Sequence, residues 1–399
     1  MNAKTILSAI LAVAANAIIP MAAKADEYND SDGQTWSYTV GEDGKSVTLT
    51  GVSDKSLSYD AAKFPWTFQK DGTWYTVTNV AANACKDWAA LSGTLSIPGT
   101  VKGIGGTLFG NNGDGAFFGC SGLTGLLISE GVETIGNGAF RNAVNATGGS
   151  GSLIIPSSVQ SLGHDFLLYG GQPIVAVWIK GFPTVSSGTQ SYAQISPYRM
   201  IYYVSGSLKT ILIGPNTERL YSNVTMLYKT MTGVTVYLPA NGKWDSNAAI
   251  GGKDTKVFKY GEGKDLNLDI DESAGKITAT VKTAEALSAV LDSAANFKTY
   301  FGLDTRIEVV DALDIAAGTI TAAQLQYATF NSLMLAVKTQ DQLNSILGVV
   351  PASVPVSIDP TGATQNLSVS TADGRKVYVL LPENGTYKLR PDGLIISFH

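Results

Sequence analysis

The clearest pattern in the chain lies in the stretch Ala116–Phe140, where apolar and polar positions alternate at strand spacing and then turn back. Leu126 and Ile128 flank Leu127, so a short strand would turn two side chains to one face and one to the other. The dipeptide Ala-Phe opens the stretch at position 116 and returns at position 139. A unit this short cannot bury its own apolar side chains, whereas stacked copies bury each other's. The pattern therefore predicts one repeat of a solenoid.

The same strand recurs along the chain when it is aligned on its two inward positions. The first inward row is Leu95, Leu126, Leu153, Val177, Ile211 and Val236. The second is Ile97, Ile128, Ile155, Ile179, Ile213 and Leu238. Downstream pairs also match, namely Val101 with Ile104, Val132 with Ile135, and Val159 with Leu162. Rows that are aliphatic throughout favour stacked repeats over the alternative of an ordinary β-sandwich with chance aliphatic motifs.

Between the inward positions lies one outward position per strand, and we call these residues the outward row. Its members are Ser96, Leu127, Ile154, Trp178, Leu212 and Tyr237. The outward neighbours two residues earlier are all small: Thr94, Gly125, Ser152, Ala176, Thr210 and Thr235. Large side chains beside small ones make a grooved apolar surface, which predicts a binding face at Leu127, Ile154, Trp178, Leu212 and Tyr237. The open alternative is that another part of this chain, such as the C-terminal domain, covers it.

These residues resemble the BspA-like leucine-rich-repeat family, whose repeat reads "AF..C..L..I.IP..V..IG..AF". The matching positions are Ala116, Phe117, Cys120, Leu123, Leu126, Ile128, Val132, Ile135, Gly136, Ala139 and Phe140, while Ser129 stands where proline is usual. The resemblance covers about Tyr75 to Tyr260 and is strongest up to Leu168. It implies a secreted or surface-displayed protein that binds or adheres, and it does not imply an enzyme.

Residues 1–25 read as a signal peptide, with Lys4 before a long apolar stretch and a small-x-small cleavage pattern ending at Ala25. We expect a secreted or cell-surface protein after cleavage near Ala25, with no transmembrane span in the mature chain. Asp26–Gln34 is polar and predicts a flexible leader. Two alternating segments, Trp36–Val52 and Phe64–Val80, predict strand pairs of an N-terminal β cap over residues 26–74.

We expect the solenoid to cover residues 75–260, with Val234–Pro239 as its last clear strand. Residues 261–399 predict a smaller α/β domain that ends in β-hairpins. Val281–Leu287 and Val337–Leu343 are similar, and each pairs a strand end with a threonine N-cap and an acidic first turn.

The elements expected in this domain are three helices and three strands. The helices are Ala284–Lys298, Ala322–Phe330 (capped by Thr321) and Gln340–Leu347, and the strands are Ile277–Val281, Arg306–Val310 and Leu333–Val337. Val369–His399 is similar in its turn motifs to the short C-terminal sorting domains of Bacteroidetes secreted proteins. Apolar residues on both faces of its strand favour a buried hairpin instead.

The composition and charge of the chain limit the partners, catalytic groups and metal sites that can be expected. The chain has 399 residues, a net charge of −5 and only 15% charged residues, which disfavours a nucleic-acid partner. Its two histidines, His164 and His399, allow neither a histidine-based metal cluster nor a Ser-His-Asp set. Asp265, Asn267 and Asp269 have the spacing of a calcium loop, but their strict alternation with apolar residues favours a strand. We expect no cofactor and no metal.

The chain has two cysteines: Cys85 stands where the resembling repeat has the phenylalanine of its Ala-Phe corner, and Cys120 stands at the repeat's buried cysteine position. They read as buried thiols, with a disulfide as the alternative that an exported chain would allow.

Two functions remain open. The first is adhesion or binding, as a monomer, to a protein or glycan on a host or neighbouring cell. The alternative is an envelope or carbohydrate-processing role of the C-terminal α/β domain, with the solenoid as a spacer; a glycosidase needs only two carboxylates, and no sequence motif marks such a pair.

Overall fold

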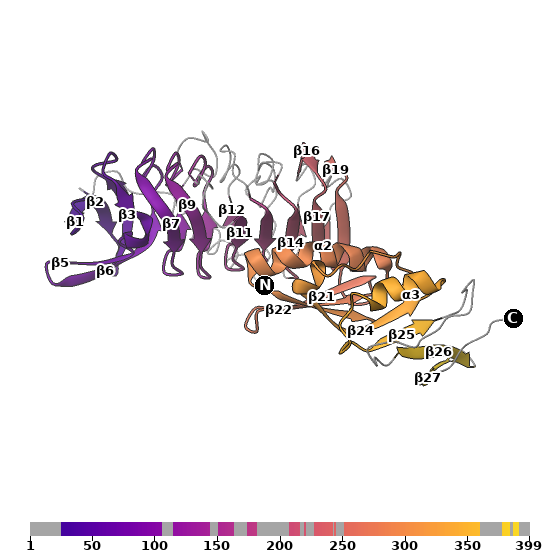
Figure 1. The fold of residues 1–399 in the computed structure, drawn as a ribbon. Coiled ribbons are helices and arrows are strands. Elements are labelled where there is room, and N and C mark those ends of the chain that lie inside the picture. The colour runs from indigo at the N-terminus through magenta and orange to yellow at the C-terminus, as the bar shows by residue number, and fades with distance from the viewer. Residues whose placement is uncertain are drawn as a thin grey trace.

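A computed structural model of the chain is rich in strands that stack side by side (Figure 1). It describes residues 25–105, 115–143, 151–162, 174–181, 207–215, 219–220, 227–241, 243–244, 251–359, 377–383 and 386–390. The predicted signal peptide up to residue 24 and both histidines lie outside the described residues.

The first sheet joins the N-terminal strands to the downstream turns of the repeats. Its strands are β1 (Asp26–Asn29), β2 (Thr35–Val40), β3 (Ser46–Val52), β5 (Thr67–Lys70), β6 (Thr73–Val80), β8 (Gly103–Ile104), β10 (Thr134–Ile135) and β12 (Ser161–Leu162). The order is β1-β2-β3-β6-β8-β10-β12, with β5 paired to β6. Val80, Ile104, Ile135 and Leu162 are partners in successive parallel strands, which confirms the predicted downstream row.

The repeat strands form two parallel sheets. One contains β4 (Tyr59–Asp60), β7 (Leu91–Ile97) and β9 (Leu123–Ile128), and the other β11 (Ser152–Ile155), β13 (Ala176–Ile179), β14 (Thr210–Ile213), β17 (Thr235–Pro239) and β20 (Lys256–Tyr260). Shorter parallel pairs join β15 (Arg219–Leu220) to β18 (Lys243–Trp244) and β16 (Leu227–Thr232) to β19 (Gly251–Lys253). β20 extends the stack beyond Val234–Pro239, the last strand that the pattern made clear.

The predicted register of the repeat strands is confirmed. Leu95 pairs with Leu126, Leu153 with Val177, Val177 with Ile211, and Ile211 with Val236. These inward side chains are buried in one apolar cluster that also takes in the N-terminal strands. Phe117 and Phe140 stack in that cluster with ring centres 5.4 Å apart and planes 5° from parallel, so the returning Ala-Phe motif marks equivalent buried corners.

The C-terminal part forms a seven-stranded sheet with helices. Its elements are β21 (Leu266–Asp271), β22 (Lys276–Val281), α2 (Ala284–Phe301), β23 (Asp304–Val309), η2 (Gln324–Gln326), β24 (Ala328–Ala336), α3 (Gln340–Leu347), β25 (Val356–Asp359), β26 (Val377–Glu383) and β27 (Thr386–Arg390). Strands β22 to β26 run parallel, as α/β connections require. Thr283 and Thr339 accept hydrogen bonds from the backbone N–H groups of Ala286 and Gln342, as the paired motif predicted.

Two predicted elements differ in the structure, and a third is confirmed. The expected helix Ala322–Phe330 is only the short 3-10 turn η2, and Ala328–Ala336 is a strand, because pairing with β23 and β25 outweighs local helix propensity. The expected leader Asp26–Gln34 contains β1, which pairs with β2. The prediction that Asp265–Asp271 forms a strand is confirmed by β21, which pairs with β22. In the part of the chain that the structure describes, no cluster of potential metal ligands occurs.

The two cysteines are free and buried, in agreement with the thiol reading. The Cys120 Sγ lies 3.0 Å from the Cys85 carbonyl oxygen. The tail adds β26 and β27 to the edge of the C-terminal sheet beside β25, which agrees with a hairpin that packs on the domain. Among the described residues, no helix is long and apolar enough to cross a bilayer.

Candidate functional site

The outward row occupies neighbouring positions on the stacked strands, as its spacing predicted. Ser96 pairs with Leu127, Ile154 with Trp178, and Leu212 with both Trp178 and Tyr237. The row thus crosses β7, β9, β11, β13, β14 and β17 on the face opposite the inward core. Parallel pairing satisfies the backbone of these strands and fixes the position of each side chain.

The structure divides this row into an open part and a covered part. Leu127 is 53% exposed and Ser96 is exposed, whereas Ile154 is half-buried. Trp178, Leu212 and Tyr237 are 3%, 0% and 0% exposed. The prediction of a binding face is therefore wrong for these last three residues, which lie in a second apolar cluster together with the C-terminal sheet and helix α2.

Helix α2 is the element that covers the row: it contacts β11 and β13, and in Figure 1 it runs across the repeat strands. The Tyr237 hydroxyl lies 2.8 Å from the Ala289 carbonyl oxygen and 2.9 Å from the Ser293 Oγ. Asn296 donates to the Thr210 hydroxyl over 2.8 Å. Small helix residues at the contact allow close approach, and burial raises the pKa of Tyr237 above its ordinary value. In this region the structure agrees with the alternative prediction, in which another part of the chain covers the outward row.

Trp178 lies at the edge of the covered part. Its ring is 5.4 Å from that of Phe301 at the end of α2, and its indole N–H is buried without a hydrogen-bond partner. The Lys180 ammonium lies 5.0 Å from the centre of the Trp178 ring and 2.5 Å from a Glu272 carboxylate oxygen. Glu272 follows β21, so this contact ties the repeat strands to the C-terminal sheet a second time.

The row of small outward neighbours has a different role in each part. A side chain at Gly125 would place its Cβ 2.7 Å from the Thr94 Oγ1, so glycine makes room for the exposed threonine beside it. Ala176, Thr210 and Thr235 are buried; Ala176 lies in the second apolar cluster, and Thr210 accepts the hydrogen bond from Asn296 of α2. The open surface therefore consists of Thr94, Ser96 and Leu127, with the half-buried Ile154 at its border, where it packs against the second apolar cluster. We call this surface the open strand face.

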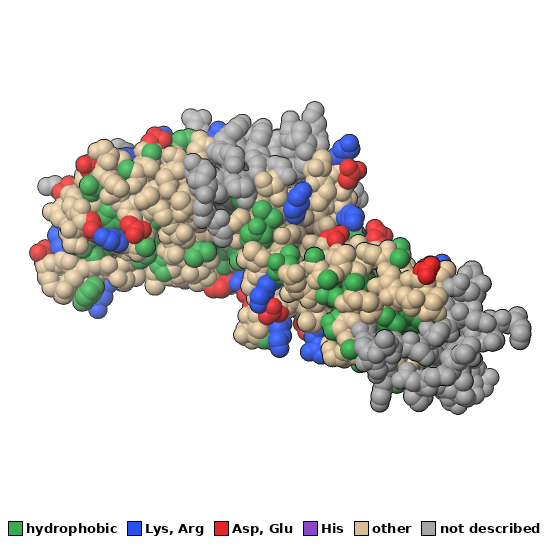
Figure 2. All heavy atoms as spheres, in the orientation of Figure 1, with side chains coloured by type: hydrophobic (Ala, Val, Ile, Leu, Met, Phe, Trp, Pro, Cys, Tyr) green, Lys and Arg blue, Asp and Glu red, His purple; other side chains and the backbone are tan. Residues whose placement is uncertain are grey.

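Sequence reasoning missed α2 as the covering element, although the helix carries a signal. Its buried residues are Ala286, Leu287, Ala289, Val290, Leu291, Ser293, Ala294, Phe297 and Phe301. These positions exceed one amphipathic stripe, and a helix that is apolar on two sides packs against two partners. Figure 2 shows Lys and Arg interspersed with Asp and Glu on the visible face, with no large area of one sign.

Comparisons with known proteins give two similar solved structures. One is a leucine-rich cell surface protein from Faecalibacterium prausnitzii A2-165, with 14% identity over 86% of this chain and 85% of that chain and a TM-score of 0.35. The other is a leucine-rich repeat protein from Bacteroides ovatus ATCC 8483, with 12% identity over 86% and 88% of the two chains and a TM-score of 0.26. No family model and no curated protein matches the chain.

Proposed function

We propose that this chain is an exported binding protein that engages a protein or glycan on a cell surface through the open strand face. The observation that carries the proposal is the division of the outward row. The chain covers Trp178, Leu212 and Tyr237 with its own helix but leaves Leu127 53% exposed on the same face. Parallel strands with paired backbone groups and small polar residues around one large apolar side chain suit a macromolecular contact.

The proposal assigns no reaction to the protein. The repeat strands and the C-terminal sheet share one apolar cluster, which disfavours the alternative of a C-terminal enzyme carried on a simple spacer. The pattern of a signal peptide over residues 1–25 supports export, and the resemblance of the repeats supports surface display.

Binding of the fluorescently labelled full chain to epithelial cells and to whole bacteria tests this proposal by flow cytometry. Leu127→Arg should lower binding by about tenfold, because it places a charge at the centre of the contact. Val310→Arg is the matched control, since Val310 is a comparably exposed apolar residue, 44% exposed, in the C-terminal part. Equal binding by the two variants, or no binding by the unmodified chain to any cell tested, would refute the proposal.

A further inference from the structure

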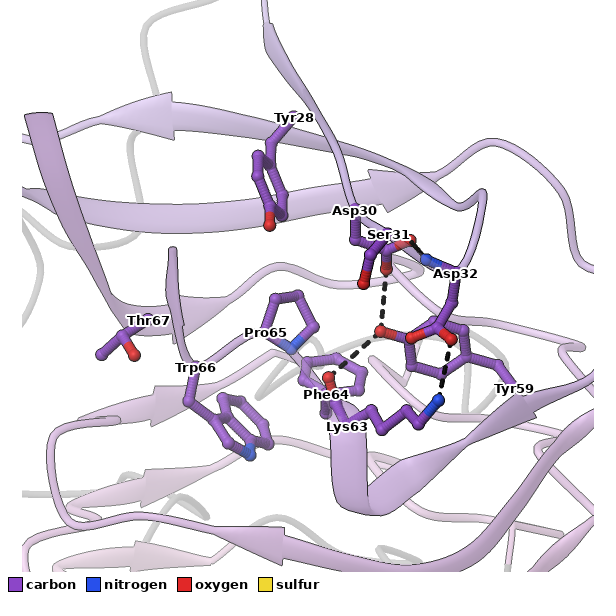
Figure 3. A pocket seen from close by; sticks show the side chains of 10 residues that line it. All are labelled: Tyr28, Asp30, Ser31, Asp32, Tyr59, Lys63, Phe64, Pro65, Trp66 and Thr67. Atoms are coloured by element: carbon purple, nitrogen blue, oxygen red, sulfur yellow. Dashed lines mark hydrogen bonds and ion pairs between the residues drawn. The ribbon is translucent and has the colours of Figure 1, made fainter. Parts of the chain in front are cut away.

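A pocket lies at the N-terminal end of the molecule, away from the open strand face. It is open to solvent and is lined by the segment that follows β1, the 3-10 turn η1 (Ala61–Lys63) and the start of β5 (Figure 3). Its volume is about 480 Å³, which falls in the range of small-molecule sites of about 300–1,000 Å³. The function proposed above makes no use of this pocket.

Asp30 holds one wall of the pocket rigid. Its carboxylate accepts hydrogen bonds from the Trp36 indole N–H and the Tyr59 hydroxyl, each over 2.8 Å. It also accepts from the backbone N–H groups of Gln34 and Asp32 over 2.9 Å and 3.0 Å. Burial raises the pKa of Asp30, but these hydrogen bonds outweigh it and hold the pKa below its ordinary value. Asp30 is thus occupied within the protein and serves to position the wall.

The second polar group is an ion pair at the mouth of the pocket. The Lys63 ammonium lies 2.7 Å from an Asp32 carboxylate oxygen, and the two side chains are 56% and 36% exposed. An ammonium offers three donors and a carboxylate about four acceptor positions, so one contact leaves both groups with free capacity. A hydroxyl group, which both donates and accepts, can bind such a pair at two points.

The opposite side of the pocket is aromatic. Tyr28 and Trp66 are half-buried and lie across from Asp32 and Lys63 in Figure 3. Tyr28 stacks on Phe68 with ring centres 4.5 Å apart, and Trp66 packs at 4.4 Å on Phe64, which also lines the pocket, so neighbouring rings hold both side chains in place. Rings of this kind present an apolar surface with a polar tip, which suits ligands that have both C–H faces and hydroxyl groups.

We propose that this pocket binds a short neutral saccharide, with its C–H face against Trp66 and Tyr28 and its hydroxyl groups on Asp32 and Lys63. The charges favour a neutral ligand. Lys63 is already paired with Asp32, so the lining residues offer no unpaired cation that would favour binding of an acidic sugar. The carboxylate of Asp30 is filled by four donors, and that of Asp32 faces Lys63, so a cation would find no unpaired acid to bind.

The test begins with the full chain on an array of neutral gluco-, manno-, galacto- and xylo-oligosaccharides, with uronic-acid oligosaccharides and choline chloride as charged comparisons. The strongest neutral binder is then titrated by calorimetry. Lys63→Ala and Asp32→Asn should each weaken binding by about tenfold, the effect expected from loss of a charge-assisted hydrogen bond. Trp66→Ala should weaken it at least as much.

The controls are Lys45→Ala, an exposed lysine outside the pocket, and Trp74→Ala, whose side chain is 62% exposed on β6. Both should bind like the unmodified chain. The exposed pair Lys63 and Asp32 keeps the test decisive if Trp66→Ala folds poorly. Absence of neutral-saccharide binding, preference for a charged probe, or binding that survives all three pocket variants would overturn the proposal. Leu127→Arg should bind the saccharide normally, which separates this outcome from that of the cell-binding test.

Discussion

Replacing Tyr237 by phenylalanine tests whether helix α2 belongs to the repeat stack. The substitution keeps the ring, which packs 5.5 Å from that of Phe297, and removes only the hydroxyl near Ala289 and Ser293. If the outward row were an open binding face, this hydroxyl would be in water and its loss would not change stability. In the structure Tyr237 is 0% exposed and Ser293 is 1% exposed, so the loss falls on buried groups.

The expected loss follows from the groups left behind. A buried hydrogen bond contributes about 1 kcal/mol net, and a buried polar group without a partner costs about 1–3 kcal/mol. Ser293 can turn its hydroxyl toward the Ala289 carbonyl one helical turn earlier, which limits the penalty. We therefore expect Tyr237→Phe to lower the free energy of unfolding by about 1–2 kcal/mol.

Guanidinium unfolding followed by circular dichroism measures this change, and hydrogen exchange locates it in α2. Tyr327→Phe is the matched control, because Tyr327 is 37% exposed, and its effect should stay within about 0.5 kcal/mol. Ser293→Ala, alone and with Tyr237→Phe, completes a double-mutant cycle with an expected coupling above about 0.5 kcal/mol. An unchanged midpoint for Tyr237→Phe, with unchanged exchange in α2, would refute the docking of this helix on the repeat strands.

Three further predictions concern the N-terminal half. Phe117→Ala and Phe140→Ala should each cost about 3–5 kcal/mol in thermal melts, and the double variant should depart from additivity because the rings touch; a melt like that of the unmodified chain would contradict the repeat register. Burial raises the pKa of Cys85 well above its ordinary value and that of Cys120 to about 12, so Ellman's reagent at pH 8 should detect the thiols only after denaturation; rapid labelling of the folded chain would contradict this. The pKa of Asp30 is lowered from 3.8 by folding, so its contribution to stability is present above that pH and lost as the pH falls through the folded value; Asp30→Asn should reduce the loss of stability on acidification, and an identical pH profile would count against it.

The repeat register could be predicted because it depends on local side-chain chemistry. A strand that buries one face must place aliphatic residues two positions apart, and stacked copies must align those residues, as Leu153 and Val177 do. The threonine caps of α2 and α3 were predictable for the same reason, since each cap bonds only three residues onward.

Whether the outward row is exposed or covered could not be predicted from the residues of the row. An apolar side chain such as Leu212 gives the same pattern whether a separate partner or a later part of the chain covers it. The cover comes from α2, and Tyr237 and Ser293 lie 56 residues apart in sequence. The N-terminal pocket was hidden for a related reason. Asp26–Gln34 is polar and predicts a flexible leader. In the structure Asp30 accepts hydrogen bonds from Trp36 and Tyr59, and these contacts cannot be predicted from the local sequence pattern.

Helix α2 is synthesised after the repeat strands that it covers. The strands β13, β14 and β17 leave the ribosome before residues 284–301, so Trp178, Leu212 and Tyr237 emerge without the helix that buries them. For that interval the nascent chain presents a row of apolar and aromatic side chains on ready-paired strands, which is the kind of surface that chaperones hold and that neighbouring chains adhere to. The completed protein buries this surface under α2. A chain truncated before α2 keeps the repeat strands but lacks the helix that covers them, so we expect it to aggregate.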